Sequence, residues 1–338
     1  METVRVLVAL ATHHGWYVHH MDVKSAFLNG DLAEEVYVRQ PEGFVDANNV
    51  QAVLKLRKAL YGLWQSSYAR KILEQTGMTG YKLCSTPMEN RLRLSKSDGS
   101  LAVDATYYRS VVGSLRYLAN TRADIAYVVG IVSRYMEATT AQHMAAVRHL
   151  LRYISGTIHH GCKYQRGRGA KPDLVGYSDN DHGGDLDDRK SASGSVFFLG
   201  RNLITWASQK QKIIAMSSCE AEYVAAAAAA MQVVWLSRLI ADIQGTEEKS
   251  VKLLVDNKSA IALSKNPVHH DCSKHIDLRY HFIRDCVETG KIDIEYVGTE
   301  DQLADVLTKS LGRVQFMELK KRIGVEEVQL RRHKGVIC

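Results

Sequence analysis

The chain has 338 residues, enough for two domains of ordinary size, and its 46% hydrophobic and 24% charged residues are typical of a folded protein rather than a disordered one. Its net charge of +7 mildly favours a polyanionic partner such as nucleic acid. The 6 cysteines are scattered without a C-x-x-C pair, which argues against a disulfide framework or a cysteine zinc site.

The first 70 residues combine a short helix with strand-like alternation. The apolar run VRVLVALA is too short to span a membrane and predicts a core-facing helix. With no signal peptide or transmembrane span recognised, a cytoplasmic or nuclear location without membrane contact is expected. WYVHHMDV and EEVYVRQ predict two strands, and the turn signal PEG follows the second.

Residues 71–165 are expected to be mostly helical. Asp104 caps a predicted helix through DATYYRSVVGSLRYL, and ADIAYVVGIVSRYM continues with apolar residues at three- and four-residue spacing. Thr140 caps a further helix, and Gly156 is expected to end it. This part shows no cluster of chemical groups in the sequence, so it is interpreted as a helical packing domain. A boundary falls at 164–173, where glycine and basic residues interrupt the apolar periodicity.

The remainder predicts a mixed α/β domain of ordinary size. Its expected elements are, in order, the strands LVGYSD, GSVFFLG and LITWAS, an alanine-rich helix from Ser217, the strand VKLLVD, helices after Asn257 and through LRYHFIRDCVETG, the strand KIDIEYV and a final helix from Thr299.

Four acidic residues of this domain share one kind of position. Asp179 and Asp256 end strands, where α/β sheets place their ligands, and Glu222 and Asp305 lie in early helical turns. Taken singly, a strand-end aspartate is more often a cap or turn residue. Converging carboxylates would hold two hard cations such as Mg²⁺ and support phosphodiester hydrolysis.

Neighbouring polar stretches have simpler interpretations. DNDHGGDLDD resembles a calcium loop but lacks the glutamate at its twelfth position, so most of it is expected to be a solvated turn. HHDCSKH matches no common zinc template and is interpreted as a polar loop contacting substrate. Ser217 and Glu220 have capping-box spacing, whereas Glu222 lies about 200° further round the helix and is expected to face the strand ends.

Several motifs carry a resemblance to a known family. LVGYSDNDHGGDLDDRKSASGSVFFLG, SSCEAEYVA, LLVDNKSAI and QLADVLTKSL closely resemble the ribonuclease H domain of copia-type LTR retrotransposon Pol polyproteins. MDVKSAFLNGDLAEEVYVRQPEGF and KLRKALYGL resemble the reverse transcriptase of the same polyproteins. The resemblance implies a truncated reverse transcriptase palm/fingers fragment (1–70), a helical thumb/connection-like segment (71–165), a ribonuclease H-like mixed sheet flanked by helices (166–312) and a basic tail (313–338).

Matched to the family's motifs, the metal-binding carboxylates fall on Asp179, Glu222, Asp256 and Asp305. The implied activity is hydrolysis of the RNA strand of an RNA–DNA hybrid with two Mg²⁺ ions, or Mn²⁺ in their place, and no small-molecule cofactor. Residues expected near the nucleic-acid backbone are Arg189, Lys190, His275 and Lys309.

The sequence also departs from the family. Asp22 matches the first polymerase carboxylate, but no Y-x-D-D occurs, so DNA synthesis is expected to be lost. His182 replaces an expected tryptophan, and whether His275 or His281 assists catalysis stays open. Two alternatives remain: a catalytically silent nucleic-acid-binding remnant of a retrotransposon polyprotein, and a relic whose product misfolds.

Overall fold

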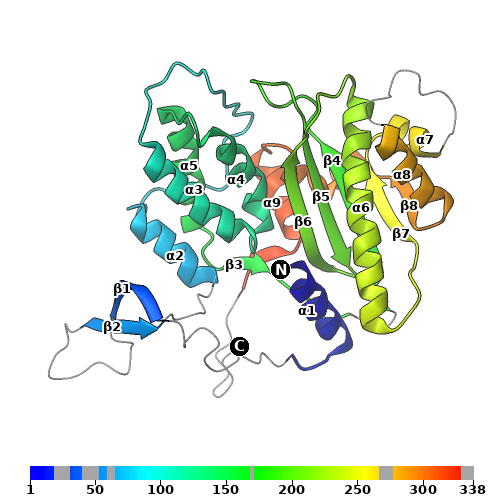
Figure 1. The fold of residues 1–338 in the computed structure, drawn as a ribbon, viewed down its shortest axis with the longest axis horizontal. Coiled ribbons are helices and arrows are strands. Elements are labelled where there is room, and N and C mark those ends of the chain that lie inside the picture. Colours follow the sequence, from blue (N-terminus) through cyan, green and yellow to red (C-terminus); the bar gives the residue numbers. More distant parts are fainter. Residues whose placement is uncertain (19–30, 40–52, 59–64, 168–170, 266–276, 329–338) are drawn as a thin grey trace.

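The computed structural model describes residues 1–18, 31–39, 53–58, 65–167, 171–265 and 277–328 (Figure 1). A mixed sheet with strand order β6-β5-β4-β7-β8 lies at its centre. β5 is antiparallel to both β4 and β6, whereas β4, β7 and β8 run parallel. The strand bounds agree with the predicted runs: β4 (Leu174–Asn180), β5 (Ala192–Leu199), β6 (Asn202–Lys210), β7 (Val251–Val255) and β8 (Ile292–Tyr296).

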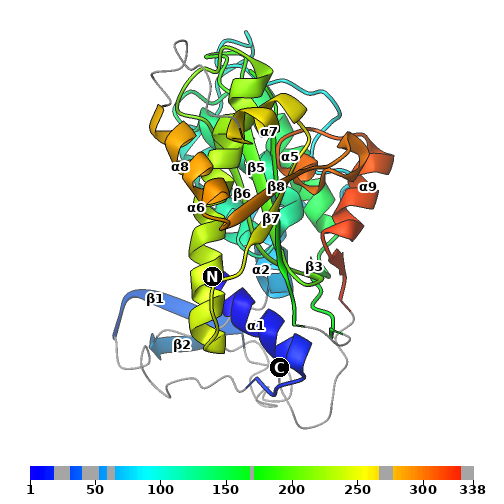
Figure 2. The same cartoon turned by 90° about the vertical axis from the view of Figure 1, so that its right-hand side faces the viewer.

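One face of the sheet is covered by the long helix α6 (Ser218–Gln244), with α8 (Asp277–Glu288) and α7 (Lys258–Lys265) beside it (Figures 1 and 2). The alanines of α6 are almost all buried, because small side chains let the helix lie close to the strands. By length and composition alone α6 could cross a membrane, and half of its most apolar window is buried inside the protein.

The N-terminal helix α1 (Glu2–His14) also packs on this domain. Val6 and Leu10 join the core formed by α6 and the sheet, as expected for a core-facing helix. The Arg5 guanidinium donates to the carbonyl of Ile204 and lies 3.8 Å from the ring centroid of Trp206. The first helix therefore contacts strand β6, 199 residues further along the chain.

The strand expected at EEVYVRQ is confirmed as β1 (Asp31–Arg39), which pairs antiparallel with β2 (Val53–Lys58). Of the strand expected at WYVHHMDV, residues 16–18 are not in a strand, and the rest lies outside the described residues.

The opposite face of the sheet is covered by helices of the middle segment. Leu115 and Leu150 of these helices share one core with Val196 and Phe198 of β5. The predicted helix through ADIAYVVGIVSRYM is interrupted by 3₁₀ turns at both ends. The helices are α2 (Gln65–Gln75), α3 (Ala105–Ala119), α4 (Ala126–Val132) and α5 (Ala141–Ser155).

The C-terminal part differs from the expected single helix. The 3₁₀ turns η4 (Thr299–Asp301) and η5 (Leu303–Leu307) take its place, because Gln302 is extended and its side chain binds the Ser178 carbonyl instead of continuing a helix. Helix α9 (Arg313–Arg322) and strand β9 (Val325–Glu327) follow, and β9 pairs with β3 (His160–Cys162) of the middle segment. The described part of the expected basic tail is thus folded.

A buried ionic network joins the middle segment to α9. The Arg122 guanidinium is fully buried and donates to both oxygens of Asp124, at 2.8 and 2.7 Å, and to Thr157. The Tyr153 hydroxyl also donates to Asp124 at 2.5 Å, and Lys320 Nζ of α9 lies 3.7 Å from the same carboxylate. Burial opposes ionisation of Asp124, but Arg122 outweighs it and holds the pKa of Asp124 below its ordinary value.

Candidate metal centre

Three of the predicted carboxylates meet at one edge of the sheet. Asp179 lies near the end of β4, Asp256 directly follows β7, and Glu222 lies in the second turn of α6. Because β4 and β7 are parallel neighbours, their carboxyl ends meet at the same edge. Each residue offers one oxygen, and these oxygens lie within 4.8 Å of one another.

Asp305 reaches the same centre through a lysine. It lies in η5 and is buried, and its Oδ1 accepts from Lys309 Nζ at 2.7 Å. The same ammonium lies 3.1 Å from Asp179 Oδ2, and the Thr308 hydroxyl donates to that oxygen as well. Asp305 therefore stands beside Asp179 with Lys309 between them, rather than within the three-carboxylate cluster.

The carboxylates raise one another's pKa values because they lie close together in a buried site. Burial, with the charges of Asp179 and Asp256 next, raises the pKa of Glu222 to about 9. Burial also raises the pKa of Asp179 to about 7 against the opposing effect of Lys309, and it raises the pKa of Asp256. Asp179 and Asp305 hold the Lys309 pKa above its ordinary value despite burial. The site thus favours an additional positive charge.

Of the two carboxylate oxygens of Glu222, one accepts a hydrogen bond and the other accepts none from the described residues. Its Oε2 accepts from Asn180 Nδ2, whereas Oε1 is buried and has no hydrogen-bond partner among the described residues. A buried carboxylate oxygen without a partner destabilises the fold unless a ligand binds to it. Carboxylate oxygens are the ligands that Mg²⁺ and Mn²⁺ prefer, so the donor set fits such a cation.

A glycine that sequence reasoning missed sets the distance between η5 and the sheet. Gly194 of β5 pairs with Asp179 in the strand register. A Cβ built at Gly194 would lie 2.6 Å from Thr308 Cγ2 and 3.0 Å from the Ala304 carbonyl oxygen. Only glycine therefore allows η5, which carries Asp305, to lie this close to β5.

The carboxylates open into a cavity of about 690 Å³ whose walls come from two parts of the chain. One wall is the sheet edge with Glu222 and Lys309. The other belongs to the middle segment, for which the sequence predicted packing only. Its lining residues include Arg91, Arg93, Tyr127 and Arg134.

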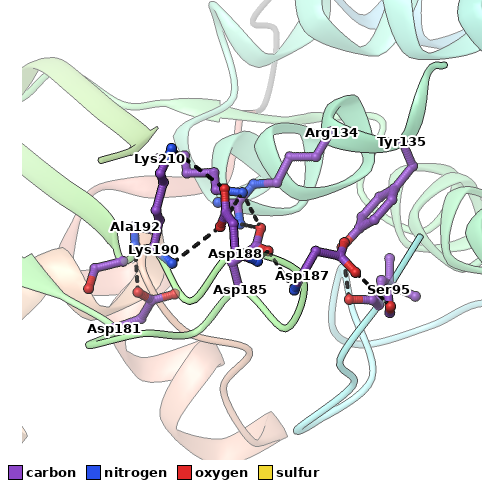
Figure 3. Close-up of polar contacts among 12 residues, drawn as sticks. Ser95, Arg134, Tyr135, Asp181, Asp185, Asp187, Asp188, Lys190, Ala192 and Lys210 are labelled. Atoms are coloured by element: carbon purple, nitrogen blue, oxygen red, sulfur yellow. Dashed lines mark hydrogen bonds and ion pairs between the residues drawn. The ribbon is translucent and has the colours of Figure 1, made fainter. Parts of the chain in front are cut away.

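The acidic stretch after β4 contains an exposed turn, as expected from the sequence, but Asp185 within it is buried (Figure 3). Asp185 is only 4% exposed and binds Arg134 at 3.0 Å and Lys210 at 2.6 Å. Asp187 accepts from the Ser95 hydroxyl at 2.7 Å. The stretch is ordered because basic groups from α4's flank and β6 neutralise it, and those partners are distant in sequence.

The remaining residues singled out from the sequence are not part of the carboxylate cluster or lie outside the described residues. Lys190 Nζ lies 3.7 Å from Asp188, and neither Lys190 nor the exposed Arg189 lines the cavity. His182 is exposed at the cavity, and its backbone N–H donates to Asn180. His281 is exposed on α8, and Asp22 and His275 fall outside the described residues.

The two glutamates at the start of α6 have different surroundings. The Glu220 N–H donates to the Ser217 hydroxyl at 3.1 Å, as predicted for the cap. The Glu220 carboxylate accepts from the Met216 N–H at 2.8 Å, one residue before the partner that a capping box requires. Glu220 is thus bound to the backbone at the helix start, and Glu222 belongs to the carboxylate cluster.

The strand order, the mixed pairing and the carboxylates at the sheet edge define a ribonuclease H-like α/β fold. A family profile described as reverse transcriptase (RNA-dependent DNA polymerase) matches residues 1–72. The Pol polyprotein from transposon RE1 of Arabidopsis thaliana is 32% identical over 96% of this chain, and that from TNT 1-94 of Nicotiana tabacum is 31% identical over 96%. Over almost its whole length, the chain is thus homologous to a part of the copia-type retrotransposon Pol polyproteins.

The chain spans 28% and 32% of the length of these two relatives. Among solved structures, the N-terminal RNase H domain of a Mycobacterium tuberculosis protein is 15% identical, with 44% of this chain and 97% of that chain covered and a TM-score of 0.30.

Proposed function

We propose that this chain is a metal-dependent ribonuclease that hydrolyses the RNA strand of RNA–DNA hybrids. The observation that carries the proposal is the convergence of Asp179, Glu222 and Asp256 within 4.8 Å at the edge of the sheet, with Asp305 beside Asp179. Two divalent cations held by such carboxylates activate a water molecule and stabilise the leaving oxygen of a phosphodiester.

The side chains of this site would bind the cations through their negative charge, and neighbouring residues would hold them in position. Asp179, Glu222 and Asp256 would hold one cation, and Asp179 with Asp305 would hold the second. The Oε1 of Glu222, which has no partner among the described residues, supports the assignment of Glu222 to the first cation, because a bound cation would give this buried oxygen a partner. Asn180 orients Glu222 through its other oxygen, and Thr308 orients Asp179.

The cavity supports a polymeric substrate. It is open to solvent, and its walls come from the sheet edge and the middle segment, so a strand could lie between them. Recognition would rest on backbone shape and on the 2′-hydroxyl, which distinguish the RNA strand from DNA without reading base sequence.

Polymerase activity is proposed to be absent. A polymerase centre needs carboxylates from two motifs to hold its two metals. The sequence contains Asp22 in MDVKSAF but no Y-x-D-D. The expected result is no nucleotide incorporation on a primed template; incorporation abolished by Asp22→Ala would contradict it.

The test of the nuclease proposal is Mg²⁺-dependent cleavage of a hybrid labelled on its RNA strand. Asp256→Asn is expected to abolish the product, whereas Asp242→Asn, an exposed aspartate late in α6, should leave it unchanged. Salt-sensitive hybrid binding without product under Mg²⁺ or Mn²⁺ would instead identify the chain as a silent nucleic-acid-binding remnant.

A further inference from the structure

Residues 91–96, here called the strap, connect the middle segment to the metal centre. At one end, the Arg91 N–H donates to Ser310 Oγ at 3.0 Å, and Ser310 directly follows Lys309. At the other end, the Ser95 hydroxyl and the Lys96 N–H donate to Asp187 at 2.7 and 3.1 Å. The strap is therefore fixed at both ends to the ribonuclease H-like domain.

Between these contacts the strap alternates as an extended segment does. Leu94 is 3% exposed, and its carbonyl accepts from the Tyr135 hydroxyl at 2.8 Å. Arg91 and Arg93 are exposed, and both line the cavity that contains the carboxylates. Arg91 has φ of 59°, a conformation that non-glycine residues seldom adopt and that the Ser310 contact helps to hold.

The other basic side chains of the cavity are already paired. Arg134 binds Asp185, and Lys309 binds Asp179 and Asp305. Neither Arg91 nor Arg93 has a side-chain hydrogen-bond or ion-pair partner within the part of the chain that the structure describes. The strap arginines are thus the cavity's unpaired guanidinium groups within that part.

We propose that Arg91 and Arg93 bind backbone phosphates of the hybrid strand that enters the cavity, so that the middle segment forms part of the substrate site. This inference rests on the proposed function. Carboxylates hold cations but repel a polyanion, so the strand needs separate positive groups nearby. Guanidinium groups bind phosphate through two parallel N–H donors. The contacts at both ends of the strap set the positions of Arg91 and Arg93.

The experiment measures binding of a fluorescent RNA–DNA hybrid to the full chain in Ca²⁺, by anisotropy, between about 50 and 200 mM salt. Each phosphate contact contributes about 0.9 to the slope of log affinity against log salt. Arg91→Gln with Arg93→Gln should reduce the slope by about 2 and the affinity roughly 30-fold near 150 mM salt. Lysine at both positions should restore most of the slope, because the charge is kept.

The matched control is Arg109→Gln with Arg148→Gln, which removes the same charge from exposed positions of α3 and α5 outside the cavity. An affinity and slope of the strap variant equal to those of the control would overturn the proposal. Cleavage by the wild-type chain in Mg²⁺ separates the two claims. If the wild type binds but does not cleave, the nuclease proposal fails, while a weakened strap variant still supports the strap.

Discussion

Lys309 Nζ lies 2.7 Å from Asp305 and 3.1 Å from Asp179, so one ammonium bridges two of the carboxylates assigned to metal binding. The lysine and Asp305 are four residues apart, and the Lys309 N–H donates to the Asp305 carbonyl at 3.1 Å just after the 3₁₀ turn η5. The ammonium supplies a positive charge where Asp179 and Asp305 would otherwise face each other. A divalent cation shared by these two aspartates would have to replace that ion pair.

Lys309→Met should therefore strengthen divalent-cation binding. A charge-assisted contact is worth about 1.5 kcal/mol or more, so removing the competing ammonium should tighten binding by about tenfold. Titration calorimetry with Mn²⁺ measures this without cleavage, and Lys265→Met on α7 is the exposed control. Weaker Mn²⁺ binding in Lys309→Met would show that the lysine supports the site rather than competing for it.

Gly194→Ala should displace η5, which carries Asp305, from strand β5. The added methyl would meet Thr308 and the Ala304 carbonyl, so η5 must move away from β5. Overpacking of this kind costs about 1–3 kcal/mol of unfolding free energy, and Mn²⁺ affinity should fall with it. Gly113→Ala in α3 meets nothing within 4 Å and serves as the control in urea denaturation. Unchanged stability and Mn²⁺ affinity in Gly194→Ala would refute the close-approach role.

The carboxylate site was largely predictable from sequence, and its surroundings were not. Strand-end positions and family motifs identified Asp179, Glu222 and Asp256, because local patterns decide where a strand ends. The cavity wall formed by Arg91 and Arg93 depends on how the middle segment docks on the sheet. No periodicity within RLRLSK indicates that contact.

The acidic stretch after β4 also depends on contacts that the sequence does not indicate. Asp185 is buried because Arg134 and Lys210 approach it from elements far along the chain. In the sequence alone, a run of aspartates is typical of a solvated turn. Arg5 of α1 likewise stacks on Trp206 of β6, a contact between segments that lie far apart in the sequence.

The buried ion pair gives a stability prediction. Asp124→Ala should lower the unfolding free energy by about 3–5 kcal/mol, because the Arg122 guanidinium would remain buried without its carboxylate. Replacing both residues, with Arg122→Met and Asp124→Leu, should restore most of the loss, since an apolar pair avoids the desolvation penalty. Urea denaturation measures both. A double variant as unstable as Asp124→Ala would show that the network's remaining hydrogen bonds dominate.

Lys320 gives a pH-dependent prediction. Burial lowers its pKa to about 8 although Asp124 opposes the shift, and Nζ has no hydrogen-bond partner among the described residues. A lysine whose folded pKa lies below its unfolded value makes the unfolded state bind more protons between the two values, so stability rises with pH from about 8 to about 10.4.

Lys320→Met should remove that rise and stabilise the protein at pH 7 by up to about 3 kcal/mol, since the side chain is nearly inaccessible. The gain over wild type should shrink as pH approaches about 10.4. Urea midpoints across this range check it, with the exposed neighbour Lys321→Met as control. A Lys320→Met variant less stable than wild type at pH 7 would mean that the ammonium is needed by Asp124.

In the proposed mechanism, Glu222 and not Glu220, two residues earlier in α6, holds the catalytic cation. The most direct measurement compares Mg²⁺-dependent hybrid cleavage by Glu222→Gln and Glu220→Gln in the full chain. Glu222→Gln should abolish the product, because it replaces a cluster carboxylate, and Glu220→Gln should keep most of it, because an amide oxygen still accepts from the Met216 N–H. Cleavage that survives Glu222→Gln and disappears in Glu220→Gln would contradict the account.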